Sequence, residues 1–163
     1  MSDLLLKAPI NYEPKRQNRF LFRFPSDLGI QEWWITTAAR PSVTINSTTW
    51  NFLNTSVDIP GSYKWQPIQI TMNDPIGPSA AQAVMEWLRL HAESATGRMG
   101  YAAGYMRDIE LVMLDPTGVV IEKWSLVNTF LSNNVGFGSL NYSSTDIANI
   151  QITLNYQRAL LLY

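Results

Sequence analysis

Residues 105–127 read YMRDIELVMLDPTGVVIEKWSLV and carry the clearest hairpin pattern in the chain. The first ten residues alternate polar and apolar side chains, with Ile109 and Leu111 on the apolar side, which is typical of a strand with one buried face. The Asp-Pro-Thr-Gly sequence at 115–118 places Asp, Pro and Gly where a type I turn prefers them. A β-prone run returns from Val119. This stretch therefore predicts an antiparallel hairpin.

Alternating runs outside this hairpin predict more strands. Aromatic residues occupy every second position from Phe20 to Phe24, in a strand that begins at Asn18. The other segments expected to be extended are 31–37, 42–49, 64–73 and 149–157. Residues 50–63 read as a long excursion, closed by the turn pair Pro60-Gly61.

A single helix is expected at about 79–93, where the hydrophobic period changes from 2 to 3.6. Ser79 and Gln82 fit a capping box at its start. Its apolar stripe is predicted to consist of Ala81, Val84, Met85, Leu88 and Ala92. Residues 94–104 are rich in glycine and are expected to be irregular.

Together these elements predict a mainly β (α+β) domain, an antiparallel β-sandwich or barrel with one flanking α-helix. The expected organisation is an extended N-terminal arm at 1–17, the sandwich domain at 18–158 and an apolar C-terminal tail at 159–163.

Composition excludes several classes of function. Only 15% of the 163 residues are charged, against ~25% in a typical domain, and the net charge of -1 gives no global basic field for nucleic-acid binding. The absence of cysteine excludes disulfides and thiol chemistry. No signal peptide or membrane span is predicted, so the expected compartment is the cytoplasm or a particle assembled there.

The basic residues are unevenly placed. Residues 1–23 hold five basic and two acidic residues, a local charge of +3, while the remainder of the chain is at -4. The segment is interpreted either as a solvated arm or as an arm that docks on an acidic neighbouring surface.

No catalytic, metal or cofactor site is predicted. His91 is the only histidine, and a lone histidine rarely makes a metal site. Asp108 and Glu110 share one strand face, which is more typical of a solvated face than of the carboxylate pair of a glycosidase. The glycines of 97–104 lead from helix to strand and lack the Lys-Ser or Lys-Thr of a phosphate loop.

Six tryptophans, at positions 33, 34, 50, 65, 87 and 124, leave a choice open. Exposed aromatic rings on a β-sandwich can stack on sugars, so a carbohydrate-binding module is one alternative. Packing in the core and at interfaces is the other.

Two features favour self-assembly over an isolated monomer. Both ends of the chain carry apolar clusters, and two predicted strands have a neutral face where a monomer would usually show charge. A sheet that joins neighbouring copies needs less protection, because its edges are paired.

The order of landmarks resembles the tail tube proteins of contractile-tailed bacteriophages. The shared features are Asn18-Arg19-Phe20, Pro60-Gly61 before Trp65, Asn73-Asp74, a helix ending near Trp87, the Leu-Asp-Pro-Thr-Gly-Val turn, Glu122 to Val127, Leu140 to Ser144 and the last strand to Tyr156. The resemblance covers about residues 18–157. One departure is 128–132, which lacks the Gly and Pro that the family often has there.

This resemblance implies a structural, non-enzymatic subunit of the virion. In the implied assembly, six copies form a ring whose sheets join into one inner β-barrel, and rings are expected to stack helically into a conduit for DNA ejection. The implied partners are further copies, the tail sheath protein, the baseplate tube-initiator and the tail terminator. The tape measure protein and genomic DNA are expected to pass through the lumen without specific binding, and the tail is expected to be assembled in the host cytoplasm.

Two sets of residues are predicted to carry this function. The lumen-facing candidates are Gln69, Thr71, Asn73, Gln151, Thr153 and Asn155. The candidates for contacts between subunits, expected outside regular strands, are Leu4, Leu5, Leu6, Ile10, Tyr12, Trp50, Phe52, Leu160, Leu161, Leu162 and Tyr163. The alternatives are the tube of a phage-like injection system with protein cargo, a baseplate tube-initiator paralogue, and the sugar-binding module.

Overall fold

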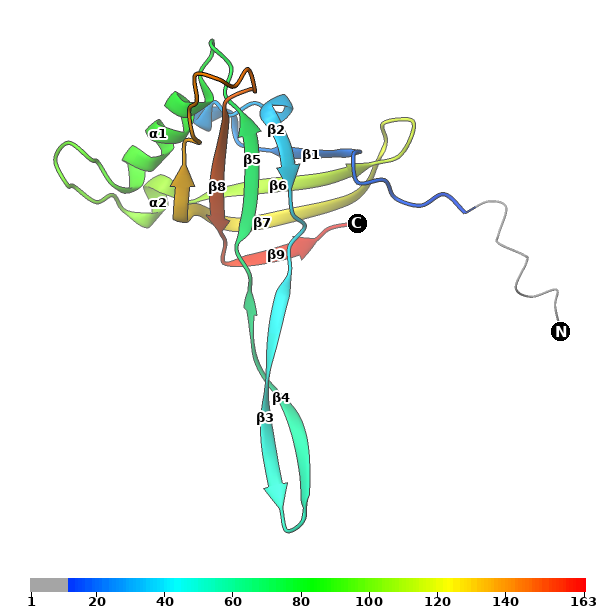
Figure 1. Ribbon diagram of the computed structural model, residues 1–163. Helices are drawn as coiled ribbons and strands as arrows, with labels where there is room; N and C mark the ends of the chain where they lie inside the picture. Colours follow the sequence, from blue (N-terminus) through cyan, green and yellow to red (C-terminus); the bar gives the residue numbers. More distant parts are fainter. Residues whose placement is uncertain (1–11) are drawn as a thin grey trace.

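The computed structural model describes residues 12–163, which form two antiparallel sheets, a helix at one end and a long projecting hairpin (Figure 1). The strands are β1 Phe20–Arg23, β2 Ile35–Ala38, β3 Val43–Phe52, β4 Thr55–Trp65, β5 Ile68–Asn73, β6 Arg107–Leu114, β7 Val120–Gly136, β8 Asn149–Asn155 and β9 Arg158–Leu161. The helices are α1 Ala80–His91 and α2 Ala102–Tyr105, with 3-10 turns η1 Ser26–Leu28 and η2 Glu32–Trp34. The expected fold class is confirmed.

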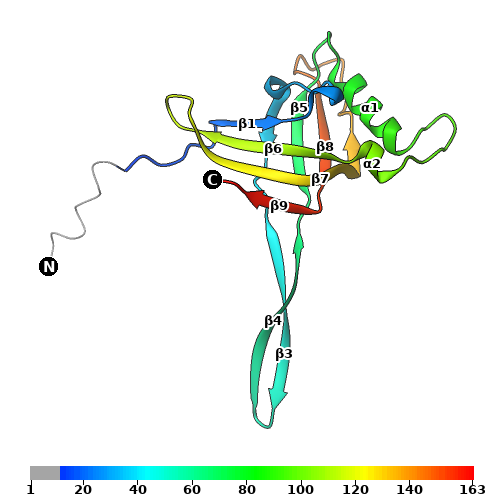
Figure 2. The same cartoon turned by 180° about the vertical axis from the view of Figure 1, so that it is seen from behind.

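The long strand β7 belongs to both sheets. Its first half pairs with β6 and β9, which together with β1 form sheet A, in the order β1-β6-β7-β9. Its second half pairs with β8, which continues to β5 and β2 to form sheet B. The strands of sheet A run across those of sheet B in both views (Figures 1 and 2).

β7 changes partner at a residue with a positive φ. Asn128 has φ 53°, and Thr129 is the last residue paired with β6 before Phe130 pairs with β8. The Asn128 amide donates to Asp108 (2.9 Å), and its side chain donates to Gln157 (2.7 Å). Asparagine tolerates this left-handed conformation better than most residues, so the segment without Gly or Pro continues as a bent strand.

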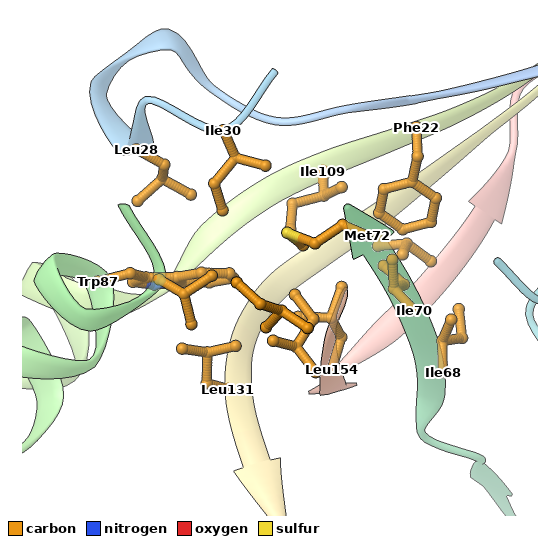
Figure 3. Packing of buried hydrophobic residues seen from close by; sticks show 14 of the residues in the cluster. Phe22, Leu28, Ile30, Ile68, Ile70, Met72, Trp87, Ile109, Leu131 and Leu154 are labelled. Carbon is orange, nitrogen blue, oxygen red and sulfur yellow. The ribbon is translucent and has the colours of Figure 1, made fainter. Parts of the chain in front are cut away.

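The core lies between the two sheets and is closed at one end by α1 (Figure 3). Phe22 and Ile109 enter from sheet A, and Ile70 and Leu154 from sheet B. Trp87 reaches the core from the helix and is buried beside Leu28 and Leu131 in Figure 3. Alternating residues of β5 and β8 are buried as the sequence predicts.

The hairpin predicted at 105–127 is confirmed. β6 pairs antiparallel with β7, and the Gly118 amide donates to the Asp115 carbonyl (3.2 Å) across the turn. Gly118 has φ 88°, which glycine adopts without steric cost. The Asp115 carboxylate accepts from the amides of Thr117 and Val119. The Thr117 hydroxyl also donates to Asp115 and is the main cause that lowers the pKa of this carboxyl.

The buried face of α1 is rotated from the predicted stripe. Ser79 caps the helix as expected, accepting from the Gln82 amide (3.5 Å). The buried positions, however, are Ala80, Ala83, Val84 and Trp87. Met85 is only partly buried. Small alanines let the helix approach the core, so the indole of Trp87 and not the Met85 side chain fills it.

Three further expectations were wrong. Residues 32–34 form the turn η2, which buries Trp34, and the strand expected from residue 31 begins only at Ile35. Residues 94–104 include the first turn of α2. Pro60-Gly61 lies inside β4, in a hairpin that spans the expected excursion. A two-stranded ribbon tolerates proline because each strand has one unpaired edge.

Candidate assembly surfaces

The six side chains predicted to line a lumen lie together on one face of sheet B. Gln69 is opposite Thr153 and Thr71 is opposite Gln151 in the register of β5 and β8. All six point away from the core, since the residues between them are buried. Gln69 and Gln151 are exposed, and Thr71, Asn73, Thr153 and Asn155 are partly exposed.

Charge is divided sharply between the two sheets. The sheet B segments 35–38, 68–73, 129–136 and 149–155 contain no Asp, Glu, Lys or Arg. The strand segments of sheet A contain Arg23, Arg107, Asp108, Glu110, Glu122, Lys123 and Arg158. On the outer face of sheet A, Glu110 pairs with Lys123 across β6 and β7 (2.9 Å). The outer face of sheet B therefore presents only amides, hydroxyls and apolar groups from its strands.

The β3–β4 hairpin is a second candidate surface, because almost every residue in it is exposed. Near its tip, Trp50 lies opposite Val57 and Thr48 opposite Ile59. The Trp50 and Phe52 rings stack with centroids 5.9 Å apart. These residues share one face by alternation, while Ser, Thr, Asn and Asp residues occupy the other. The tip of the hairpin is therefore amphipathic, although both of its faces meet solvent.

Trp50 and Phe52 lie in a regular strand, which corrects the expectation that they would lie outside one. Sequence reasoning also missed the apolar residues across the hairpin, Ile45, Val57, Ile59 and Tyr63, all exposed. The alternation on both sides of Asn54 was the signal that could have revealed them. Two loops at the opposite end of sheet B carry further exposed apolar side chains (Figure 1), namely Ile76, Leu140, Tyr142 and Ile147.

The C-terminal tail is part of sheet A. Leu160 and Leu161 belong to β9, again inside a regular strand, and lie opposite Ser125 and Trp124. The Leu162 amide donates to the Lys123 carbonyl (2.8 Å), which extends this pairing. The side chains of Leu160, Leu161, Leu162 and Tyr163 remain exposed at the sheet edge. Tyr12, in the N-terminal segment, is also exposed. Leu4, Leu5, Leu6 and Ile10 lie outside the described residues.

A buried carboxylate joins three parts of the chain. Glu122, on β7, is only 6% exposed. It forms ion pairs with Lys15 of the N-terminal segment and with Arg40 between β2 and β3 (3.6 Å), and accepts from the Trp124 indole (2.6 Å). Burial would raise the pKa of Glu122, but the hydrogen bonds from Lys15 and Trp124 and both cationic charges outweigh it and lower that pKa.

The polar groups considered for catalysis have structural partners. Asp108 accepts from the Asn128 amide, and Glu110 pairs with Lys123. His91 stacks on Tyr105 with ring centroids 4.3 Å apart. Within residues 12–163, no group of His, Cys, Asp and Glu side chains could hold a metal ion. None of the helices in this range is long and apolar enough to span a membrane.

The tryptophans are divided between core and surface. Trp34 and Trp87 are buried, Trp65 and Trp124 are partly buried, and Trp33 and Trp50 are exposed. The two exposed rings belong to separate elements, η2 and β3. Trp50 stacks on Phe52, and Trp33 makes an edge contact with Trp34. Packing within the protein therefore explains most of the tryptophans.

Comparison with known proteins gives one family and a group of related folds. The profile of the family described as "T4-like virus tail tube protein gp19" matches residues 16–159. No curated protein matches the chain.

Several solved structures share the fold. The anti-feeding prophage cap (AFP tube terminating cap) is similar with a TM-score of 0.73 and 20% identity, over 99% of this chain and 98% of that one. For the sheath-tube complex of the PVC extracellular contractile injection system in its extended state, the TM-score is 0.70 and the identity 16%, over 93% of both chains. For the six-fold symmetrised baseplate of the anti-feeding prophage, the TM-score is 0.69 and the identity 13%, over 93% of this chain and 97% of that one.

Proposed function

The chain belongs to the T4-like virus tail tube protein gp19 family, and from this premise we propose that six copies close into a ring and that rings stack into a hollow tube that conducts DNA. The family is one of structural tail tube proteins, which supports a structural role for this chain. A similar fold in a six-fold symmetrised baseplate supports the number of copies.

The charge-free face of sheet B is the observation that carries this proposal. Each Lys or Arg that neutralises a phosphate adds affinity for DNA through counterion release. A wall built from Gln69, Thr71, Gln151 and Thr153 offers no such charge, so a sliding duplex meets little resistance. We therefore assign this face, with Asn73 and Asn155, to the lumen.

The unpaired edges of sheet B give the ring its means of closure. Among the described strands, β2 pairs only with β5, and residues 130–136 of β7 pair only with β8. A free edge is a template for pairing with another chain. In the proposed ring, the β2 edge of one copy lies beside the β7 edge of the next, and a continuous inner barrel results.

The projecting elements are assigned to contacts between copies. An isolated two-stranded ribbon is marginally stable in water, so the β3–β4 hairpin gains stability by packing against a neighbour. The hairpin and the apolar loops lie at opposite ends of sheet B (Figure 2), an arrangement suited to head-to-tail stacking. The proposed contact residues are Leu4, Leu5, Leu6, Ile10, Tyr12, Trp50, Phe52, Leu160, Leu161, Leu162 and Tyr163.

The proposed setting is the tail of a virion, assembled in the host cytoplasm. The tube would contact a sheath protein along its length, a tube-initiator at the baseplate and a terminator at the other end. The tape measure protein and the genome would pass through its lumen.

Electron microscopy of the purified chain tests assembly directly. Rings or hollow rods are expected, and a monomer that persists at high concentration would contradict the proposal.

The lumen assignment is tested with single-cysteine variants, because the chain has no cysteine. In long, end-capped tubes, Thr153→Cys should react with a small maleimide but not with one coupled to a large polymer. Glu86→Cys, on the exposed face of α1, is the control and should react with both.

A protein-conducting injection system is the second candidate, and the similarity to the anti-feeding prophage and PVC structures supports it. A neutral wall also suits protein cargo. Particles purified from the natural source separate the two. Tubes joined to DNA-filled heads support a phage tail, and headless particles support an injection system.

A further inference from the structure

Glu122 stands out because its charge is buried at the meeting point of three segments. Its two carboxylate oxygens are both engaged. Oε2 pairs with the Lys15 ammonium, and Oε1 accepts from the Trp124 indole and faces the Arg40 guanidinium at 3.6 Å. A buried charge is costly unless it is paired and hydrogen-bonded, so this carboxylate constrains the groups that surround it.

One cation comes from the described N-terminal segment that precedes β1, and the other comes from the connection that leads into the projecting hairpin. Lys15 lies in the segment that enters β1 from the N-terminus. Arg40 lies between the end of β2 and the start of β3, at the root of the hairpin. Beyond this root the hairpin has almost no buried residue. The Gln66 amide donates to the Ser42 carbonyl (2.9 Å), which closes the root but does not connect it to sheet A.

We propose that Glu122 is a positioning residue that fixes the direction in which the N-terminal segment and the β3–β4 hairpin leave the sandwich. Its strand is central in sheet A, between β6 and β9, and is therefore a rigid base. Lys15 and Arg40 are about half exposed, so either ion pair alone is weak. Because both ion pairs share one buried carboxylate, together they fix the positions of the two segments relative to each other.

This inference rests on the proposed function, because a fixed direction matters only if the hairpin and arm must meet neighbouring copies. Subunits with a loosened root would still fold but would present their hairpins over a range of angles. Assembly would then lose conformational entropy at every contact. A hairpin root whose direction is fixed before assembly avoids this loss. Removing the Glu122 charge is therefore expected to weaken tube formation.

The test is hydrogen exchange and tube assembly with Glu122→Gln. Glutamine keeps the shape and an acceptor for Trp124 but removes the charge. Exchange should accelerate at the Arg19 and Gln66 amides, which donate to the Arg16 and Ser42 carbonyls, but not in α1. The critical concentration for tubes should rise about tenfold or more. Glu110→Gln is the matched control, since it removes a partly exposed ion pair from the same sheet, and it should change neither quantity.

A double variant that keeps both positive charges distinguishes a positioning role of Glu122 from general structural support. Lys15→Arg with Arg40→Lys keeps both cations and should assemble nearly as the unaltered chain does. Lys15→Gln with Arg40→Gln should behave like Glu122→Gln, and it also serves if the latter does not fold. Unchanged exchange in both charge-removing variants would overturn the inference. Failure of the unaltered chain to form tubes would instead contradict the proposed function and leave the exchange result intact.

Discussion

Replacing Trp50 with alanine tests whether the hairpin supplies energy for assembly. The ring is 58% exposed in the free subunit, and so is its stacking partner Phe52. An aromatic side chain buries ~150–250 Å², so roughly 90–145 Å² of Trp50 remains for a neighbour to cover. At ~25 cal/mol per Å² this area is worth roughly 2–4 kcal/mol. The figure is an upper estimate, because it assumes complete burial.

Such a loss should raise the critical concentration for tube formation roughly 30- to 700-fold, since ~1.4 kcal/mol corresponds to a factor of ten. Sedimentation of tubes across a series of subunit concentrations measures this quantity. Asn51→Ala is the matched control, because Asn51 is adjacent and exposed but lies on the polar face of the hairpin. Far-ultraviolet circular dichroism and the melting temperature show whether the sandwich is intact.

The reasoning would be refuted if Trp50→Ala tubes formed at a critical concentration within twofold of the unaltered protein. Phe52→Ala should give a similar shift, because it occupies the same face and has the same exposed fraction. A large effect of the Asn51 control would place the contact on the other face of the hairpin.

Four further outcomes are expected. Thr153→Lys should leave tubes intact but make them retain DNA at low salt and release it at high salt, whereas Thr153→Gln should retain none in a filter-binding assay. Asp74→Ala removes an acceptor for the first two amides of α1, so calorimetry should show a loss of ~1 kcal/mol and ~2–4 °C in melting temperature. Since the pKa of Glu122 is lowered, its ion pairs stabilise the fold above the ordinary carboxyl pKa and are lost as pH falls through the lowered value. The protection factor at the hairpin root, which removes the intrinsic pH dependence of amide exchange, should therefore be constant near neutrality and fall only in acid. Deleting residues 1–12 should leave a folded subunit, by circular dichroism, that fails to form long tubes by electron microscopy.

Local chemistry explains which elements the sequence predicted well. The 105–127 hairpin depends on a turn whose Asp115 and Gly118 are three residues apart, so the signal is short-range. The neutral faces of β5 and β8 follow from strict alternation, and pairing of these strands was not needed to see them. The register then places Gln69 beside Thr153, which alternation alone could not establish.

The errors arose where two local patterns competed or where partners are distant. Pro60-Gly61 has turn chemistry, yet it lies in a strand because only one edge of that strand is paired. In α1, two apolar stripes share Val84, and only the approach of the sheet selects the one that contains Trp87. The ion pair between Glu122 and Lys15 joins residues 107 apart in sequence, which no local pattern reveals.

The passage of β7 from one sheet to the other has a mechanical consequence. A pull on sheet A reaches sheet B through the peptide backbone itself at Asn128, and not merely through van der Waals contact between the two layers. If sheet B forms the inner wall and sheet A lies outside it, a shear applied to the exterior is shared with the interior by covalent bonds. The two sheets of each subunit would then stay joined under load, so a force applied to the outside of the tube would move the whole wall.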